Sequence, residues 1–275
     1  MDSRRQTRSW YLLGRLYDLA FAGMFIGLRR RVAAAVERDG LYPWLDVCCG
    51  TGSQLRGHVP VVRVPDIVVC GLDKNLGMVR YAAARAPGLP FVCGDAGHLP
   101  FKNGSFRAVS VSFGLHDKSS DLRRAMMAEA RRVLAPGGRF IAVDFENPWS
   151  ARSRAGALAV RAVERLAGGD HYRNGREFLS RGGLRAFLRE NGFVEVSRRD
   201  IATGSISVVV ASPYSSCERG PEPDIKRGSN LPFAAKGRFD PLLMASRFFF
   251  STAKASFLGS EGRAGRAPAG IRPAS

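Results

Sequence analysis

The stretch LDVCCGTG, residues 45–52, decides the fold of this 275-residue chain. An apolar strand pattern runs straight into a Gly-x-Gly turn, and an acidic residue, Asp46, stands four positions before the first glycine. Glycines at such a turn let the backbone approach a ligand closely and open the N-terminus of a helix. The stretch therefore predicts the first strand and a ligand-binding turn of an α/β domain.

Outward from this turn, strand patterns alternate with helical patterns. Strands are expected at 42–47, 66–72, 91–93, 106–113 and 140–145, and helices at 76–85, 122–134, 151–166 and 178–191. This alternation predicts a Rossmann-like, doubly wound and mostly parallel sheet. The last two strands, 193–196 and 205–211, have no helix between them, so we expect an antiparallel hairpin at one edge.

Acidic residues follow the second and third predicted strands. Asp73 stands one strand-helix-strand step after Asp46, where a carboxylate can accept two hydrogen bonds from a ribose diol. Asp95 could accept a hydrogen bond from an exocyclic amine such as that of adenine. Taken singly, Asp73 could equally cap the next helix and Asp95 could be a turn aspartate. Their order after the glycine turn favours the nucleotide interpretation.

The chain is strongly basic, with 42 Lys and Arg against 24 Asp and Glu and a formal net charge of +18. Such a balance favours anionic partners, but a genome-wide preference for arginine explains it as well, since no Lys/Arg block exceeds three residues. The five cysteines have no metal-ligand spacing, so we expect no metal site and a reducing cytoplasm.

The motifs DVCCGTG, GLDKNLGMVRYA, GDAGHLPFKNGSF, VSFGLHD and RRVLAPGGRFIAVDF, in this order, resemble those of class I S-adenosylmethionine-dependent methyltransferases. Within that class the chain resembles most the ubiquinone/menaquinone biosynthesis C-methyltransferases, over residues 11–211. The family usually has Arg-Asn where this chain has His116-Asp117, at a position that faces the substrate.

The resemblance implies S-adenosylmethionine as the cofactor and assigns residues to its parts. In chain order these residues are Asp46, Gly50, Thr51, Gly52, Asp73, Met78, Asp95, Ala96 and Ser112. The first four would hold the methionine part and the fifth the ribose. Met78, Asp95 and Ala96 would contact the adenine, and Ser112 would lie beside the cofactor.

Methyl transfer to the carbon of a phenol or quinol ring needs a base that removes a hydroxyl proton. His116 is the candidate base, with Asp117 as the residue that orients it; the alternative is a histidine that only caps the loop. His171 and Tyr172 are secondary candidates for lining the substrate pocket, or else part of a surface loop.

Three regions follow from this interpretation. Residues 1–40 would form a helical cap over the substrate, residues 41–212 the methyltransferase domain, and residues 213–275 a low-complexity, disordered tail. The apolar run in the first region is too short to span a bilayer, so we expect a cytoplasmic protein that touches the inner face of the membrane. No nucleic-acid partner is expected.

The predicted activity is C-methylation of a quinone precursor, such as a demethylmenaquinol, or of a similar hydrophobic ring. Methylation of another small molecule or of a phospholipid head group remains open, as does a non-catalytic protein that binds S-adenosylmethionine. An NAD(P)-dependent oxidoreductase is disfavoured because the third glycine of GxGxxG is missing after Gly52.

Overall fold

The computed structural model describes residue 18 and residues 26–57, 68–147, 169–201 and 204–214. The helix expected at 151–166 and nearly all of the expected tail lie outside these residues, as does most of the segment before residue 26. The three-region division therefore stays a prediction.

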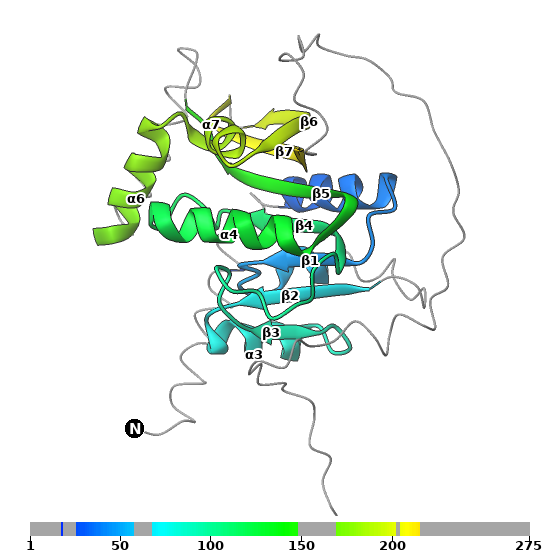
Figure 1. The fold of residues 1–275 in the computed structure, drawn as a ribbon. Helices are drawn as coiled ribbons and strands as arrows, with labels where there is room; N and C mark the ends of the chain where they lie inside the picture. The colour runs from blue at the N-terminus through cyan, green and yellow to red at the C-terminus, as the bar shows by residue number, and fades with distance from the viewer. Residues whose placement is uncertain (1–17, 19–25, 58–67, 148–168, 202–203, 215–275) are drawn as a thin grey trace, which may run out of the picture.

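The described chain is built around one seven-stranded sheet with the order β3-β2-β1-β4-β5-β7-β6 (Figure 1). Its strands are β1 (Trp44–Val47), β2 (Val69–Asp73), β3 (Phe91–Cys93), β4 (Phe106–Ser112), β5 (Leu134–Phe145), β6 (Phe193–Ile201) and β7 (Ile206–Pro213). The first five strands pair in parallel, whereas β7 is antiparallel to both β5 and β6. The predicted Rossmann-like sheet with an antiparallel edge hairpin is confirmed.

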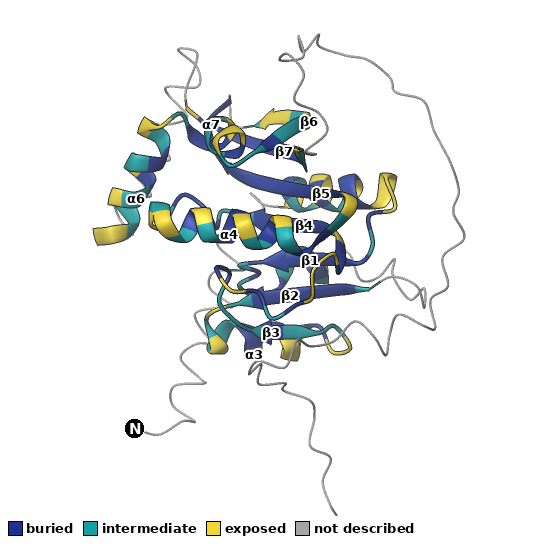
Figure 2. Cartoon of the chain, viewed as in Figure 1, coloured by how far each residue is buried: buried dark blue, intermediate teal, exposed yellow. Residues whose placement is uncertain are grey.

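Successive side chains along each strand face opposite sides of the sheet, so two cores form. Leu45 and Val109 belong to one core, and their neighbours Trp44 and Ala108 to the other. Figure 2 shows the central strands buried along nearly their whole length, as expected for a parallel sheet covered on both faces.

Helices cover both faces. The first core is closed by buried side chains of α4 (Ser120–Val133), α6 (Gly169–Ser180) and α7 (Gly183–Glu190). The second is closed by helical residues 26–38, with Leu28, Val32 and Val36 buried against it. Next to them, α3 (Leu76–Arg85) packs on β2 and β3, and the short α2 (Ser53–Arg56) follows the glycine turn.

Three predicted elements in the carboxyl half, one helix and two strands, were wrong in their extent. The single helix expected at 178–191 is split into α6 and α7 at Gly182 and Gly183, whose φ angles of 106° and 71° lie outside the helical range. Because α6 begins at Gly169, His171 and Tyr172 lie on a helix and not in a loop.

The other extent errors concern two strands. The strand expected at 140–145 begins earlier, at Leu134, because β5 bulges over residues 135–138 opposite the start of β4. The strand expected at 193–196 continues to Ile201. The sequence pattern missed this extent because β6 is an edge strand, and its exposed charged residues conceal the alternation typical of a strand.

Candidate active site

The glycine turn after β1 has a backbone that few residues other than glycine adopt. Gly50 and Gly52 have φ angles of 52° and 68°, and Cys48, which precedes them, has a φ of 59°. Positive φ in a residue with a side chain is strained and is found mainly at functional positions. The turn ends where α2 begins, so its backbone N–H groups lie at the carboxyl edge of the sheet.

Gly52 lies too close to its neighbours to accept any side chain. A Cβ atom placed there would be 2.7 Å from the Phe91 ring and 2.9 Å from the Ala82 Cβ. Gly71 on β2 lies equally close to Phe91: a Cβ atom placed at Gly71 would be 2.6 Å from the Phe91 ring. The conformation and the close approach therefore explain why this sequence has glycine at position 52.

We expect Gly52→Ala to lower the free energy of unfolding by about 2–4 kcal/mol, since left-handed strain and overpacking each contribute about 1–2 kcal/mol. Gly50→Ala is the matched control: it has the same left-handed φ, but no atom lies within 4 Å of its built Cβ. Its expected loss is about 1 kcal/mol. Urea unfolding of the two variants measures this, and equal losses would contradict the packing argument.

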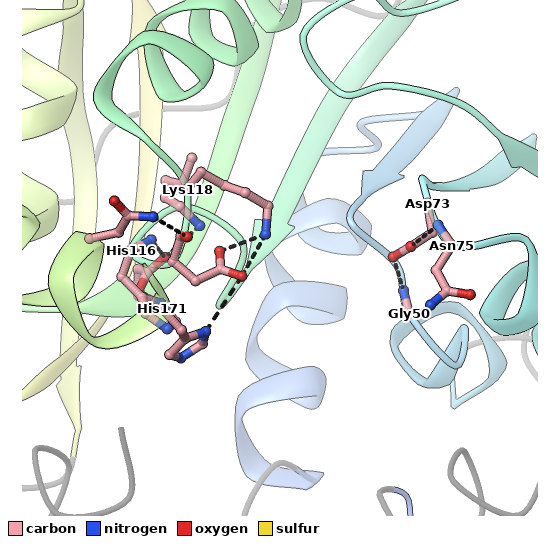
Figure 3. Close-up of polar contacts among 10 residues, drawn as sticks. Gly50, Asp73, Asn75, His116, Lys118 and His171 are labelled. Carbon is pink, nitrogen blue, oxygen red and sulfur yellow. Dashed lines mark hydrogen bonds and ion pairs between the residues drawn. The ribbon is translucent and has the colours of Figure 1, made fainter. Parts of the chain in front are cut away.

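Asp73 holds the turn against the end of β2 (Figure 3). Its carboxylate accepts hydrogen bonds from the backbone N–H groups of Gly50, at 2.8 Å, and Asn75, at 2.8 Å. Each carboxylate oxygen keeps a second lone pair. The next helix is capped by Asn75 and not by Asp73, because the Asn75 side chain accepts hydrogen bonds from the N–H groups of Gly77 and Met78.

Two adjacent cavities lie on either side of this turn. One, of about 210 Å³, is lined by residues that include Asp46, Gly50, Thr51, Met78 and Ser112. The other, of about 440 Å³, is lined by residues that include Asp73, Asp95, Ala96 and Lys118. Cys48 lines both, so the two cavities border the same residue just after β1.

The cavities divide the predicted cofactor residues into two groups. The smaller cavity is lined by Asp46, Gly50, Thr51 and Ser112, and the larger one by Asp73, Asp95 and Ala96, whereas Gly52 lines neither. Met78 lines the cavity of the turn and not the cavity of Asp95 and Ala96, with which it was grouped as an adenine contact. An elongated molecule with an amino-acid end and a nucleoside end matches this division.

Ser112 provides an independent sign of a missing polar partner. Its hydroxyl oxygen is buried and has no hydrogen-bond partner within the part of the chain that the structure describes. Buried hydroxyl groups are almost always hydrogen-bonded. Because Ser112 lines the cavity of the glycine turn, a polar group of a ligand would complete it, and the residues present fit the predicted cofactor.

Asp46 is buried beneath the turn in a line of polar contacts. Trp44 Nε1 donates to Ser110 Oγ at 2.8 Å, and Ser110 Oγ donates to Asp46 Oδ1 at 2.6 Å. Burial raises the pKa of the Asp46 carboxyl to about 7, partly opposed by the Ser110 hydrogen bond. This carboxyl group therefore titrates near neutral pH in the folded protein.

The raised pKa of Asp46 predicts a pH-dependent stability. The folded state keeps a proton that the unfolded chain releases near pH 4, so stability from this group falls as the pH rises from about 4 to about 7 and is constant above that. Asp46→Asn removes the titration but keeps an oxygen for Ser110. We expect the difference in unfolding free energy, wild type minus variant, to fall by at most about 4 kcal/mol over this range. Urea unfolding at several pH values measures it, and a constant difference would contradict the assignment.

Other predicted cofactor residues also have defined partners. Thr51 Oγ1 donates to Asp18 Oδ1 at 2.7 Å, and Arg56 donates to the other oxygen of Asp18 at 2.7 Å, so residue 18 is fixed beside the turn. Asp95 accepts from the N–H of Gly97 at 2.8 Å and from Lys74 Nζ at 3.3 Å. The Gly97 hydrogen bond, above all, lowers the pKa of Asp95.

His116 lies beyond β4, and its orienting partner differs from the one predicted. Its ring Nδ1 lies 2.7 Å from Oδ1 of Asp144, a fully buried residue near the end of β5. The prediction that Asp117 orients the ring was wrong, because β5 brings a carboxylate that is distant in sequence to the place next to the histidine.

Asp117 joins a second polar group beside the first (Figure 3). Its carboxylate accepts from Lys118 Nζ at 2.6 Å and lies 3.8 Å from Nδ1 of His171, while its backbone oxygen accepts from Asn174 Nδ2 at 2.9 Å. These contacts connect the loop after β4 to α6. Lys118 also lines the larger cavity, so this group borders the predicted cofactor site.

Aromatic rings link His116 to the smaller cavity. The His116 and Phe145 rings have centroids 4.4 Å apart, and Phe145 contacts Phe113 at 5.7 Å between centroids. Phe113 lines the smaller cavity and has a φ of 54°. The candidate base therefore lies one ring away from a residue of the cofactor cavity.

Three site residues were missed by sequence reasoning: Asp144, Lys118 and Arg29, which lines the smaller cavity from residues 26–38. A lone acid within the buried strand pattern FIAVDF is a usable signal for Asp144, because a buried carboxylate needs partners. Neither Lys118 nor Arg29 had such a signal.

Comparisons with known proteins agree with this geometry. A methyltransferase domain family matches residues 45–138. A demethylmenaquinone methyltransferase of Streptomyces griseus is 31% identical over 191 residues, which cover 66% of this chain and 80% of the relative. A ubiquinone/menaquinone biosynthesis C-methyltransferase of Burkholderia vietnamiensis is 30% identical, over 72% of this chain and 88% of the relative.

Among solved structures, one described as a putative O-methyltransferase from Nostoc punctiforme has a TM-score of 0.52, at 18% identity over 74% of this chain and 59% of that chain. At this identity the likeness concerns the fold alone. None of the described helices has the length and apolar character needed to cross a membrane.

Proposed function

Since the chain belongs to the family of S-adenosylmethionine-dependent demethylmenaquinone and ubiquinone/menaquinone C-methyltransferases, we propose that it methylates a ring carbon of a quinone precursor. The chain is a methyltransferase, and its cofactor is S-adenosylmethionine. The alignment with relatives of this name over four fifths or more of their length carries the proposal of the substrate.

The cofactor supplies an activated methyl group, so the protein mainly provides alignment and proximity. In the proposed arrangement, Asp46, Gly50 and Thr51 hold its methionine part, with Met78 and Ser112 at the same cavity. Gly52 gives the turn its shape. Asp73 holds the ribose, and Asp95 and Ala96 lie at the adenine. The adjoining cavities support this assignment, because together they suit one molecule that passes Cys48.

His116 is proposed as the base that accepts the proton of a ring hydroxyl. Removing that proton makes the ring carbon electron-rich enough to accept the methyl group. Support comes from the place of His116, at the carboxyl edge of the sheet next to the ring of Phe145, which in turn contacts Phe113. Asp117 is proposed to hold the substrate-facing part of the loop after β4 in place through its contacts with Lys118 and His171.

A substrate with a lipid tail lies in a membrane, so we propose that the protein meets the inner membrane surface peripherally. The net charge of +18 supports this, because anionic lipids attract basic proteins. Residues 1–40 are proposed to cap the substrate, with residues 213–275 as a tail outside the catalytic domain.

Transfer of a labelled methyl group tests the proposed substrate. The purified protein is incubated with labelled S-adenosylmethionine and either reduced demethylmenaquinone, a simple phenol or phosphatidylethanolamine vesicles. We expect label on a ring carbon of the quinol only, found by mass spectrometry. Label on the phospholipid, or on none of these acceptors while the cofactor binds, would contradict the proposed substrate.

A further inference from the structure

The carboxylate of Asp144 accepts more hydrogen bonds than any neutral side chain could. Oδ1 receives His116 Nδ1 at 2.7 Å and the Phe145 N–H at 2.8 Å. Oδ2 receives the N–H groups of Leu115, at 3.0 Å, and His116, at 3.3 Å. The side chain is fully buried, so these four donors replace water around the charge.

This arrangement determines which ring nitrogen of His116 carries the hydrogen. An ionised carboxylate can only accept, so the short contact at Oδ1 requires a hydrogen on Nδ1. The neutral ring then has its lone pair on Nε2. We propose that Asp144 is a positioning residue that keeps His116 in this tautomer, so that Nε2 is the atom that accepts the substrate proton; this rests on the proposed function.

The same carboxylate also fixes the backbone that carries the ring. It binds the N–H of His116 and that of the residue before it, so ring and loop are held by one group. Because one carboxylate binds both the ring and the backbone that carries it, the ring has little freedom to turn. Such double support of a site residue is typical of groups whose orientation affects the chemistry.

Several charged or titratable groups surround the dyad. Asp117 and Lys118 approach from the loop after β4, His171 from α6, with its ring edge-on to His116 at 5.3 Å, and the buried Arg123 from α4. Arg123 interacts electrostatically with both Asp144 and Asp117 and hydrogen-bonds Glu177 of α6. Of these groups, Asp144 is in direct contact with the ring, since its Oδ1 lies 2.7 Å from Nδ1 of His116.

Asp144→Asn gives a sharp expectation, because an amide has one accepting oxygen and one donating nitrogen. Two backbone donors face Oδ2 and only one, the Phe145 N–H, faces Oδ1, so the amide oxygen should stay on the side of the two. The amide nitrogen then faces His116 Nδ1, which can become an acceptor only if the ring hydrogen moves to Nε2. We therefore expect the tautomer to invert and Nε2 to lose its basic lone pair.

Nitrogen NMR of protein with ¹⁵N-labelled histidine tests this directly. In the wild type at pH above the titration of the ring, we expect His116 to show a protonated Nδ1 and an unprotonated Nε2; the Asp144→Asn variant should show the reverse. Asp117→Asn, the same change on the carboxylate that binds Lys118 and lies near His171, should leave the wild-type pattern. The His116→Gln spectrum assigns the signals.

The kinetic expectation accompanies the spectra. Asp144→Asn should lower kcat for methyl transfer by about 10²-fold or more, as loss of a general base does, with the Kd for S-adenosylmethionine within about threefold of wild type. A wild-type ring with Nε2 protonated would overturn the proposal, and so would an inverted ring with wild-type kcat. If the variant does not fold, the wild-type spectrum still shows which ring nitrogen of His116 carries the hydrogen.

Failure of the proposed function gives a different pattern. A wild type that shows the expected tautomer and binds the cofactor but does not methylate the quinol would overturn the proposed substrate, while the role of Asp144 in fixing the tautomer would stand.

Discussion

His116→Gln is expected to lower kcat for quinol methylation by about 10²- to 10⁴-fold, the usual effect of removing a general base. Glutamine is of similar size, and its amide N–H can still donate to Asp144, but it cannot accept a proton at neutral pH. Because His116 lines neither described cofactor cavity, the Kd for S-adenosylmethionine should stay within about threefold of wild type.

His171→Gln is the matched comparison for this variant. His171 lies beside the same ring, but its side chain is 33% exposed and its Nδ1 lies 3.8 Å from a carboxylate oxygen of Asp117. We expect its kcat to fall by less than about tenfold. Steady-state kinetics on both variants and calorimetry with the cofactor separate chemistry from binding. Equal losses in the two variants, or an active His116→Gln enzyme, would contradict the assignment of the base.

Asp73→Ala is expected to raise the Kd for S-adenosylmethionine by about 10²-fold or more. A ribose diol would donate two hydrogen bonds to this carboxylate, and each bond to a charged group contributes about 1.5–3 kcal/mol. The same change removes the acceptor of the Gly50 N–H, so the turn that borders the methionine part loses support as well.

Asp121→Ala controls for the loss of a negative charge, because Asp121 is a surface carboxylate with a side chain that is 88% exposed. It should leave the Kd unchanged. Thermal melting without cofactor shows whether Asp73→Ala is folded. A folded Asp73→Ala protein with wild-type affinity would contradict the ribose assignment.

The fold could be predicted because its signals are local. The apolar strands and the glycine turn each appear within a few residues of sequence, and a parallel sheet places successive strand ends at one edge. The same reasoning failed at Gly182 and Gly183, since a glycine pair within a helical pattern looks like a tolerated interruption until its φ angles are known.

The candidate site could be predicted only in part, for a related reason. Asp73 and Asp95 follow their strands directly, and their cavity is set by strand order. The partner of His116 depends on the pairing of β4 with β5, which places Asp144 beside a residue 28 positions earlier in the chain. Proximity in sequence suggested Asp117 as the partner of the ring, whereas the register of the sheet brings Asp144 next to it.

Met78 shows the limit of carrying a role along a motif. The helix α3 begins after Asp73, so its first turn can face either cavity, and the sequence does not specify which. In the structure Met78 faces the cavity of the glycine turn. Its proposed contact would then be with the part of the cofactor nearest that turn.

The central claim is that the paired cavities around the glycine turn bind S-adenosylmethionine. Calorimetric titration of the purified wild-type protein with S-adenosylmethionine, with NADH as the control ligand, tests it most directly. We expect saturable binding of S-adenosylmethionine at one site per chain, lost or greatly weakened in Asp73→Ala, and no binding of NADH. Binding of NADH, or no binding of S-adenosylmethionine by the folded protein, would contradict it.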